Sequence, residues 1–477
     1  MARSRILFPS FLEHQVHISK TICFLSVFFL VPFLFGKNVT WRGNHNNNSM
    51  WTSGQNWTTP TQISNGNITF VASGDNLFFQ GTKRVNNNND LTNASYSGIT
   101  FISGSGNFIL SGNQITLTGG ITNNSLNTQR LSFNKVIINA TRSVNVAAGD
   151  LIIQSIIQGS GGLSIVGSNT VNLNGVNTYT GATTVTSGTI SVAATTGLGM
   201  TSAVNLSSGA ELNYTGATAT LSRAISVTSG ISTVSNTGSG LLTLSGAISK
   251  DGTTLVLNGG AQGINVTGVI SGASANSDLD VYGDVVLSAE NTYNGPTTIY
   301  NGGNLTAAVA NAMGSTTDVV VHNGGSLLVQ ASNAINDSSS MELAGGTWAF
   351  DGNINETVGA LTLSANSTID MAGGHVALLF SNLAAGLSNT TRLNIFNYTP
   401  NSDSIAFSSN AHLSDSLQFI SFYSDSGSSL IENSFMSSSG PPWQVQPFPE
   451  PETWVTALLL MGGGGFWLWR KTRAASS

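Results

Sequence analysis

The chain has 477 residues, of which only 8% are charged, and its formal net charge is −6. Globular chains carry about 25% charged residues, but abundant aliphatic side chains and a small net charge exclude a disordered chain. Half of the 16 Lys and Arg residues lie close to the two ends. The acidic middle therefore excludes the class of proteins that bind nucleic acid by neutralising phosphates.

The single cysteine, Cys23, lies in an N-terminal apolar run. Residues 37–436 contain none, so this body can hold neither a disulfide nor a thiolate metal site.

Residues 1–36 have the order of a secretion signal. The basic Arg3, Arg5 and Lys20 precede the apolar run TICFLSVFFLVPFLF at 21–35. A basic segment followed by an apolar segment of this length is typical of an export signal. We expect cleavage after Gly36, although an uncleaved signal anchor is the alternative.

The body alternates apolar and polar residues in short stretches separated by Gly, Asn and Ser. Examples are GITFISG at 98–104, GNFILSG at 106–112 and NQITLTGG at 113–120. A period of two indicates strands with one buried face. Ile99 and Phe101 are accordingly expected to point in the same direction, into a core.

The same units recur along the body. NTYTG at 177–181 returns as NTYNG at 291–295, and each is followed by a similar strand, TTV at 183–185 and TTI at 297–299. A looser unit of strand, Gly-rich turn and strand appears in NLSSGAELNY, LLTLSGAIS, HNGGSLLVQ and ELAGGTWAF.

Short strands repeating over about 400 residues favour a solenoid, in which stacked coils bury a continuous core. The prediction is an all-β chain that folds as a right-handed parallel β-helix over residues 37–436, with Asn and Thr forming hydrogen-bond ladders between coils. A string of antiparallel β-sandwiches is the competing fold. Residues 39–60 and 390–436 are expected to cap the two ends, because an open end would leave an unpaired edge.

The C-terminal end has three parts in a fixed order. Residues 437–452 are rich in proline and should form an extended linker. The uncharged residues 453–469 would span roughly 25 Å as a helix, which is the short end of a membrane crossing. The basic Arg470, Lys471 and Arg473, in the tail 470–477, would hold that end in the cytoplasm as a stop-transfer signal. By this reasoning alone the segment is a membrane anchor.

The order of these parts resembles the PEP-CTERM sorting signal of Gram-negative bacteria. Pro449, Glu450 and Pro451 match its motif residue by residue. The resemblance implies recognition by an exosortase-like membrane transpeptidase, cleavage near the motif, an inner-membrane intermediate, and release to the cell surface or extracellular matrix.

The body has its own resemblance. NGVNTYTGATTVTSGTISV at 174–192 looks like the autotransporter-associated β-strand repeat of bacterial passenger domains. Residues 333–371 resemble the C-terminal part of such proteins, and 39–60 resemble their N-terminal cap, with Trp41, Trp51 and Trp57 as capping aromatics. A true autotransporter ends in an outer-membrane barrel, whereas this chain ends in a predicted helical span.

Catalytic motifs are sparse. The sequence contains no HExxH, Walker A, GxSxG, CxxC or EF-hand pattern, and we expect neither catalysis nor a cofactor. The best carboxylate group is Asp278, Asp280 and Asp284, a weak Ca²⁺ candidate for which solvated turn carboxylates are the alternative. Arg223, Lys250 and Arg392 are isolated basic residues.

The sequence therefore predicts an exported, non-enzymatic surface or matrix protein. Its rod-like body would associate with exopolysaccharide, other matrix proteins or a surface, as an adhesin would. The alternatives are a carbohydrate-active enzyme on a β-helix, which would need paired carboxylates or a basic residue with Ca²⁺, and a permanently membrane-anchored adhesin.

Overall fold

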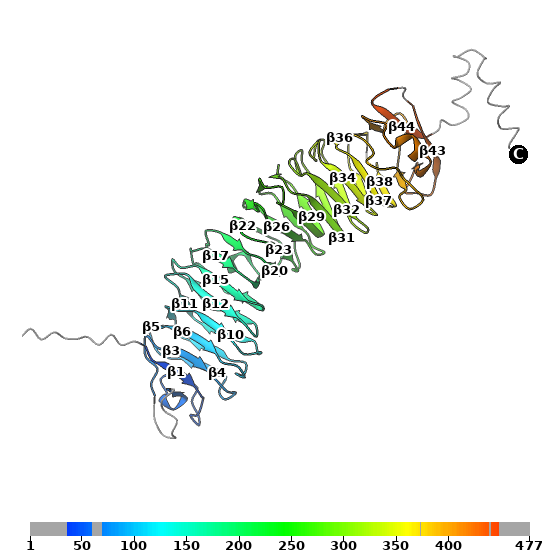
Figure 1. The fold of residues 1–477 in the computed structure, drawn as a ribbon. Helices are drawn as coiled ribbons and strands as arrows, with labels where there is room; N and C mark the ends of the chain where they lie inside the picture. The colour runs from blue at the N-terminus through cyan, green and yellow to red at the C-terminus, as the bar shows by residue number, and fades with distance from the viewer. Residues whose placement is uncertain (1–35, 60–68, 373, 438–439, 448–477) are drawn as a thin grey trace, which may run out of the picture. The chain divides into compact units, whose positions relative to one another are not determined.

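The computed structural model describes residues 36–59, 69–372, 374–437 and 440–447. Within them the chain forms a parallel β-solenoid of about 15 turns, in which each coil stacks on the one before (Figure 1). The prediction of a parallel solenoid is thus confirmed, and the β-sandwich alternative is wrong. The strand pairs are parallel along the stack, whereas the alternative needs antiparallel pairs.

Each coil places strands on up to three faces, which follow one another along the chain in the same order. The first face is a 13-stranded sheet. Its strands, in spatial order, are β2 (Trp57–Thr58), β1 (Asn38–Trp41), β3 (Asn76–Phe79), β6 (Gly98–Phe101), β9 (Ile121–Asn123), β12 (Arg142–Val146), β15 (Leu163–Gly167), β17 (Thr183–Val185), β19 (Val204–Leu206), β22 (Ile225–Val227), β25 (Ile248–Ser249), β28 (Ile270–Gly272) and β30 (Thr292–Tyr293). Later coils form this face from β36 (Ile354–Val358), β39 (Val376–Phe380) and β41 (Ser404–Phe407).

The second face runs through most of the described unit. It comprises β4 (Asn86–Asn89), β7 (Ile109–Gly112), β10 (Gln129–Phe133), β13 (Leu151–Ile153), β16 (Thr170–Leu173), β18 (Gly188–Val192), β20 (Ala210–Tyr214), β23 (Ile231–Asn236), β26 (Thr254–Asn258), β29 (Leu279–Leu287), β31 (Thr297–Ala307), β32 (Asp318–His322), β34 (Ser340–Ala344) and β37 (Leu361–Ala365).

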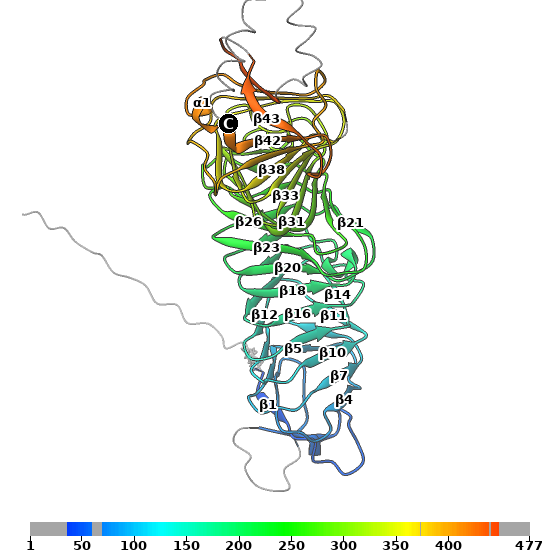
Figure 2. The same cartoon turned by 90° about the vertical axis from the view of Figure 1, so that its right-hand side faces the viewer.

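The third face begins as a four-stranded sheet and returns in later coils. Its strands are β5 (Ala94–Tyr96), β8 (Ile115–Leu117), β11 (Lys135–Ile137), β14 (Ile156–Gln158), β21 (Ala219–Leu221), β24 (Leu242–Leu244), β27 (Ile264–Val266), β33 (Ser326–Val329), β35 (Thr347–Phe350), β38 (Ser367–Asp370), β40 (Leu393–Phe396) and β42 (Ile420–Tyr423). The second halves of β29 and β31 join this face, because those two strands run through the corner. Figure 2 shows the successive coils from a second direction.

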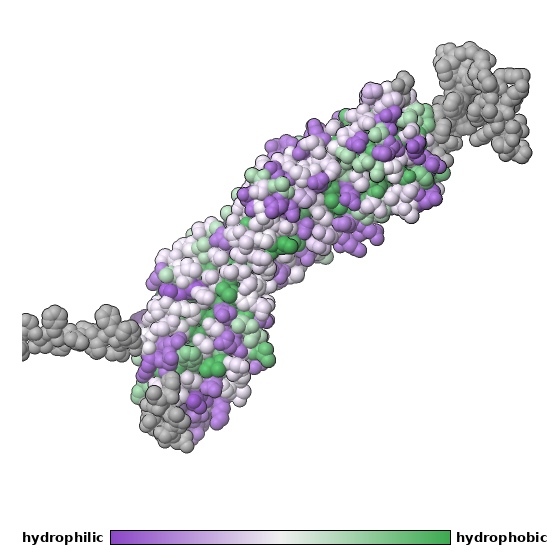
Figure 3. Space-filling model, viewed as in Figure 1, coloured by the Kyte–Doolittle hydropathy of each residue, from purple (hydrophilic) through white to green (hydrophobic). Residues whose placement is uncertain are grey.

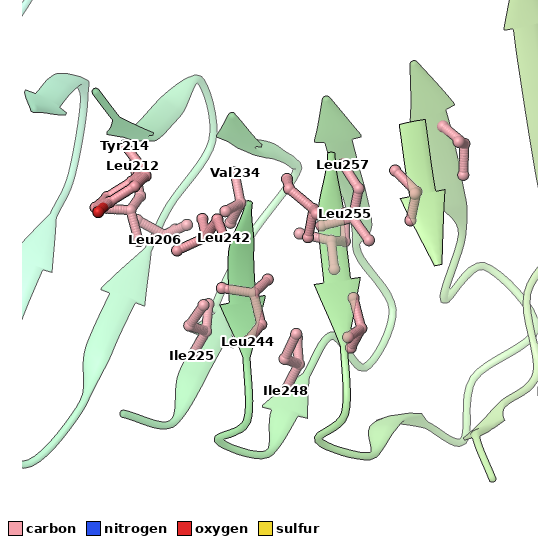
Figure 4. Packing of buried hydrophobic residues seen from close by; sticks show 14 of the residues in the cluster. Leu206, Leu212, Tyr214, Ile225, Val234, Leu242, Leu244, Ile248, Leu255 and Leu257 are labelled. Atoms are coloured by element: carbon pink, nitrogen blue, oxygen red, sulfur yellow. The ribbon is translucent and has the colours of Figure 1, made fainter. Parts of the chain in front are cut away.

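The core is a column of aliphatic side chains inside the coils. Leu212, Val234 and Leu257 stack on one face, and Ile225 and Ile248 stack on another, with their side chains directed into the interior of the coils (Figure 4). Ile99 and Phe101 are fully buried, as the alternation in GITFISG predicts. The hydrophobic effect therefore acts along the whole stack, since no coil can bury its apolar face alone.

Aromatic residues close the N-terminal end. Trp41, Trp51 and Trp57 are buried, and both Trp41 and Trp51 meet Trp57 edge to face, with ring centroids 5.1 and 5.6 Å apart. The Trp51 indole nitrogen donates to Asn87 Oδ1 at 2.8 Å. This end also holds the short helix η1 (Gly54–Asn56) and the antiparallel pairing of β2 with β1.

At the C-terminal end the pairing changes from parallel to antiparallel. Strand β43 (Leu430–Met436) pairs with β42, and β44 (Trp443–Pro447) pairs with both β43 and β41. Residues 443–447, within the expected linker 437–452, thus belong to the folded unit. The short helices α1 (Leu413–Ser416), η2 (Thr195–Leu198) and η3 (Leu417–Phe419) complete the described elements.

Candidate functional site

The sorting motif Pro449, Glu450 and Pro451 lies outside the described residues. So do the predicted span 453–469, the basic Arg470, Lys471 and Arg473, and residues 1–35 of the export signal. Among the residues that the structure describes, none belongs to a helix with the length and apolarity that crossing a bilayer requires.

Asp278, Asp280 and Asp284 lie along one strand but do not converge on a point. Asp278 immediately precedes β29, and Asp280 faces outward from it. The register then shifts between Val281 and Gly283, and Asp284 lies beyond this shift. Asp284 is exposed, and its Oδ1 accepts a hydrogen bond from Asn304 Nδ2 at 2.7 Å.

Within the described part of the chain, no three His, Cys, Asp or Glu side chains form a group able to hold a metal ion. The weak Ca²⁺ candidate is therefore wrong as a cluster. The physical reason is that the register shift separates the third aspartate from the other two.

Lys250 is the residue whose surroundings the sequence did not reveal. It follows β25, is fully buried, and its Nζ lies 4.1 Å from the centroid of the Tyr293 ring. Its ammonium group donates a hydrogen bond to the backbone carbonyl oxygen of Ser277. The stack thus brings Lys250 beside the residue that precedes Asp278, so its interpretation as an isolated basic residue is wrong.

Burial and neighbouring charges shift the pKa values of Lys250 and Asp280. Burial lowers the pKa of Lys250 to about 7, and the charges of Asp278 and Asp280 oppose this shift only in part. Burial also raises the pKa of Asp280 to about 6, with a further contribution from the Asp278 charge. Desolvation disfavours the charged form of both kinds of group, which explains the opposite directions.

A row of stacked rings runs along the outside of the neighbouring coils. Tyr282 and Tyr300 have centroids 4.7 Å apart with an interplanar angle of 1°, and His322 continues the row 5.3 Å from Tyr300. These rings use their faces to contact one another, so their edges are left for solvent. The sequence gives no signal for the row, because Tyr282 and Tyr300 are 18 residues apart whereas Tyr300 and His322 are 22 residues apart, so no fixed spacing marks the three rings.

The other basic candidates hold local structure. Arg223 donates from Nη2 to the carbonyl oxygen of Gly199 at 2.8 Å, and Arg392 donates to Asn389 Oδ1 at 3.2 Å.

A small apolar cavity lies between the coils of the N-terminal half. It has a volume of about 10 Å³ and is lined by residues such as Leu131, Val144 and Ile157. A cavity of this size has room for about one water molecule. It is therefore a packing defect rather than a ligand site.

Comparison with known proteins gives no family. The chain matches no family model, and no curated protein or solved structure is similar to it.

Proposed function

We propose that this protein is an exported, non-enzymatic β-solenoid of the cell surface or extracellular matrix that associates with exopolysaccharide. We infer a right-handed solenoid, because crossover connections between parallel strands are almost always right-handed. The C-terminal residues would act as an exosortase-type sorting signal whose membrane anchor is temporary, which makes the organism a Gram-negative bacterium.

A column of uncharged polar side chains on the first face carries the proposal. Successive paired strands place eight hydroxyl or amide side chains one above another on the outside. They are Ser143, Ser164, Thr184, Asn205, Ser226, Ser249, Ser271 and Thr292. Each is at least partly exposed. Paired strands lie about 4.8 Å apart, so the column is a regular row of hydrogen-bonding groups.

Such a row suits a long uncharged or weakly charged polymer. Sugar hydroxyls can exchange hydrogen bonds with Ser, Thr and Asn side chains without desolvating a charge, which would cost more. Most of the surface visible in Figure 3 is of intermediate hydropathy, as a coat of Ser, Thr and Gly produces.

Binding to polysaccharide tests the column. The combined change of Thr184, Asn205 and Ser226 to Ala should weaken co-sedimentation of the full chain with matrix polysaccharide several-fold. The matched control replaces Thr220, Thr243 and Asn265, which form an equivalent outward column on the third face. Equal loss from both triple variants would contradict a binding role for the first face.

The sorting signal needs a separate test in cells. Replacing Pro449, Glu450 and Pro451 with Ala should trap the protein in the inner membrane with residues 453–469 retained, as intact mass would show. The control changes Pro441 and Pro442 instead. If the unaltered mature protein keeps its C-terminal residues, residues 453–469 are a permanent membrane anchor.

The enzyme alternative predicts turnover. If the protein is non-enzymatic, as proposed, incubation of the purified protein with acidic and neutral polysaccharides should leave the length of the polysaccharide chains and the number of their reducing ends unchanged. Among the described residues, Lys250 is the lysine whose pKa is shifted. Its amine is fully buried and therefore cannot reach a polymeric substrate, which speaks for the non-enzymatic proposal.

A further inference from the structure

The charged residues of the solenoid are divided along its length. Residues 37–250 contain nine Lys and Arg and four Asp and Glu, whereas residues 251–447 contain one Lys or Arg and fifteen Asp and Glu. The formal charge is therefore +5 over the first stretch and −14 over the second. Leaving out the buried charged side chains changes neither sign. The rod is thus positive toward its N-terminal coils and negative toward its C-terminal coils.

The N-terminal coils of the second face carry a basic group. Arg130 points outward from β10, in a row with the isoleucines of β7 and β13 that pair with it. Lys135 follows at the corner where the chain turns from β10 into β11. Both side chains are half-buried, so part of each is accessible to a partner. The acidic Asp150, at the opposite edge of the face, accepts a hydrogen bond from the backbone N–H of Thr170 at 2.9 Å.

The C-terminal coils of the same face carry carboxylates. One outward row pairs strand by strand from β26 to β34 and consists of Val256, Asp280, Thr298, Val320 and Glu342. Asp318 begins β32 beside this row and accepts a hydrogen bond from the Ser340 hydroxyl. Glu342 accepts one from the Ser364 hydroxyl at 2.7 Å. These hydroxyls orient the carboxylates without neutralising them, and residues 251–391 contain no Lys or Arg that could do so.

The second face is unbroken between these two ends. Ten successive parallel pairings join β10 to β34, and Figure 2 shows many of these strands stacked in order. With about 4.8 Å for each pairing, the strip is about 48 Å long, and five residues of strand make it about 16 Å wide. It therefore offers roughly 770 Å² to a partner, close to the roughly 800 Å² per partner that a stable interface buries.

The middle of the strip has an exposed apolar side chain. Ile231 lies on β23, the central strand of this run, and is 55% exposed. Glu211, on the preceding strand, is bonded to the hydroxyls of Thr189 and Ser235 within its own face. An apolar centre between charged ends is the usual anatomy of a protein–protein interface.

We propose that two copies of this chain pair through their second faces in antiparallel orientation. The Arg130 end of each copy then lies against the end of the other copy that holds Asp318 and Glu342. A two-fold axis makes the two contacts identical and brings the Ile231 side chains of both copies to the centre. Parallel pairing is disfavoured, because it would set like charges against each other.

The division of charge favours a second copy over other partners. A polymer of uniform charge would be attracted by one end of the strip and repelled by the other. A second copy turned end for end presents the opposite order of charge along the whole length. Pairing through the second face leaves the hydroxyl column of the first face exposed on both copies, so this inference goes beyond the function proposed above and does not depend on it.

Sedimentation velocity of the purified full chain measures the pairing. At low ionic strength the chain should sediment as a dimer, and added salt should dissociate it, because salt screens exposed charges. A monomer at low ionic strength would overturn the proposal.

Charge reversals at the two ends then identify the contact. The double change Arg130→Glu with Lys135→Glu, and the double change Asp318→Lys with Glu342→Lys, should each weaken self-association about tenfold or more, since each replaces attraction between copies with repulsion. An equimolar mixture of the two variants should form the dimer again, because the reversed end of each variant meets an end of opposite charge. A mixture that stays monomeric contradicts antiparallel pairing.

The matched controls make the same charge changes away from the second face. Lys37→Glu with Arg42→Glu alters the residues that flank β1, and Glu290→Lys with Asp351→Lys alters exposed corners of the C-terminal coils. Both should leave the dimer intact, and far-UV circular dichroism verifies the β-structure of every variant. An equal loss in the controls would exclude the second face as the contact. A dimer that persists in the second-face variants and at high salt would place the contact elsewhere, which also overturns the proposal.

Discussion

Asn177 and Asn291 make the same two hydrogen bonds in two different coils. In both, the buried side chain accepts at Oδ1 from a backbone N–H of the preceding coil and donates from Nδ2 to a backbone carbonyl of the following coil. The partners are Ile157 N at 2.7 Å and Gly197 O at 2.6 Å for Asn177, and Ile270 N and Ala312 O, both at 2.7 Å, for Asn291. The repeated NTYxG motif is therefore a structural bracket that joins three coils.

Replacing either asparagine with Ala should destabilise the solenoid. Each change leaves a buried N–H and a buried carbonyl without partners, at a cost of about 1–3 kcal/mol per group. Urea unfolding should show similar losses for Asn177→Ala and Asn291→Ala. The control is Asn294→Ala, which removes a more exposed side chain bonded to Ala273 O and should change stability by less than about 1 kcal/mol. Equal losses for all three would contradict the bracket.

The tyrosine of the same motif extends the bracket. Tyr179 OH lies 2.8 Å from Thr183 Oγ1, and Tyr293 OH lies 2.7 Å from Thr297 Oγ1. Burial raises the pKa of Tyr179 to about 12, so this hydroxyl stays protonated. Tyr179→Phe and Tyr293→Phe should each lower the free energy of unfolding by about 1 kcal/mol. Tyr423→Phe is the control, and a cost as large there would count against the bracket.

The N-terminal aromatic cap should carry much of the stability of the first coils. Trp51→Ala removes a fully buried ring that meets Trp57 edge to face and donates to Asn87, and should cost about 3–5 kcal/mol. Limited proteolysis should then cut within the first coils before the rest. Trp443→Ala, at a half-buried position of the opposite end, is the control. Unchanged protease resistance in Trp51→Ala would contradict a capping role.

Glu356 should make stability depend on pH. Its buried carboxyl accepts from the backbone N–H groups of Ala334 and Ile335 at 3.0 and 2.9 Å, yet burial raises its pKa from 4.5 to about 7. The folded state therefore binds this proton more tightly than the unfolded state does. The stabilisation is complete below about pH 4.5 and is lost as the pH rises through about 7.

Urea midpoints measured between pH 4.5 and 8 check this expectation. The unaltered chain should lose stability across the window, and Glu356→Gln should lose less, because its side chain cannot ionise. The exposed Glu290→Gln is the control. An equal pH slope in Glu356→Gln and in the unaltered chain would assign the dependence to other groups.

The local pattern predicted much of the fold. The alternation in GITFISG predicted β6 and the burial of Ile99 and Phe101, and NQITLTGG predicted β8 with Ile115 and Leu117 inside. These predictions succeed because side chains alternate between the two faces of any strand, whatever the strand pairs with. The strand β44 inside the proline-rich segment was missed, since its pairing partners are β41 and β43 rather than neighbouring coils.

The candidate site was predicted less well. The sequence grouped Asp278 and Asp280 with Asp284, whereas the structure places the Lys250 amine against the carbonyl oxygen of Ser277, the residue before Asp278. The length of each coil varies, so spacing in the sequence does not tell which residues of adjacent coils meet. The register between β29 and β31 also shifts at Gly283, where φ is +61°, so the residue spacing between neighbours changes even within one pair of strands.

The sequence by itself determined that the body is made of short strands with one apolar face, joined by Gly and Asn turns and unable to fold singly. Period-two burial is a local property and can be read from the residues. Only the tertiary structure decided which residues of different coils become neighbours, because that depends on the number of residues at each corner. It therefore placed the Lys250 amine against the Ser277 carbonyl and the Tyr293 ring, and it gave the two copies of NTYxG the same hydrogen bonds.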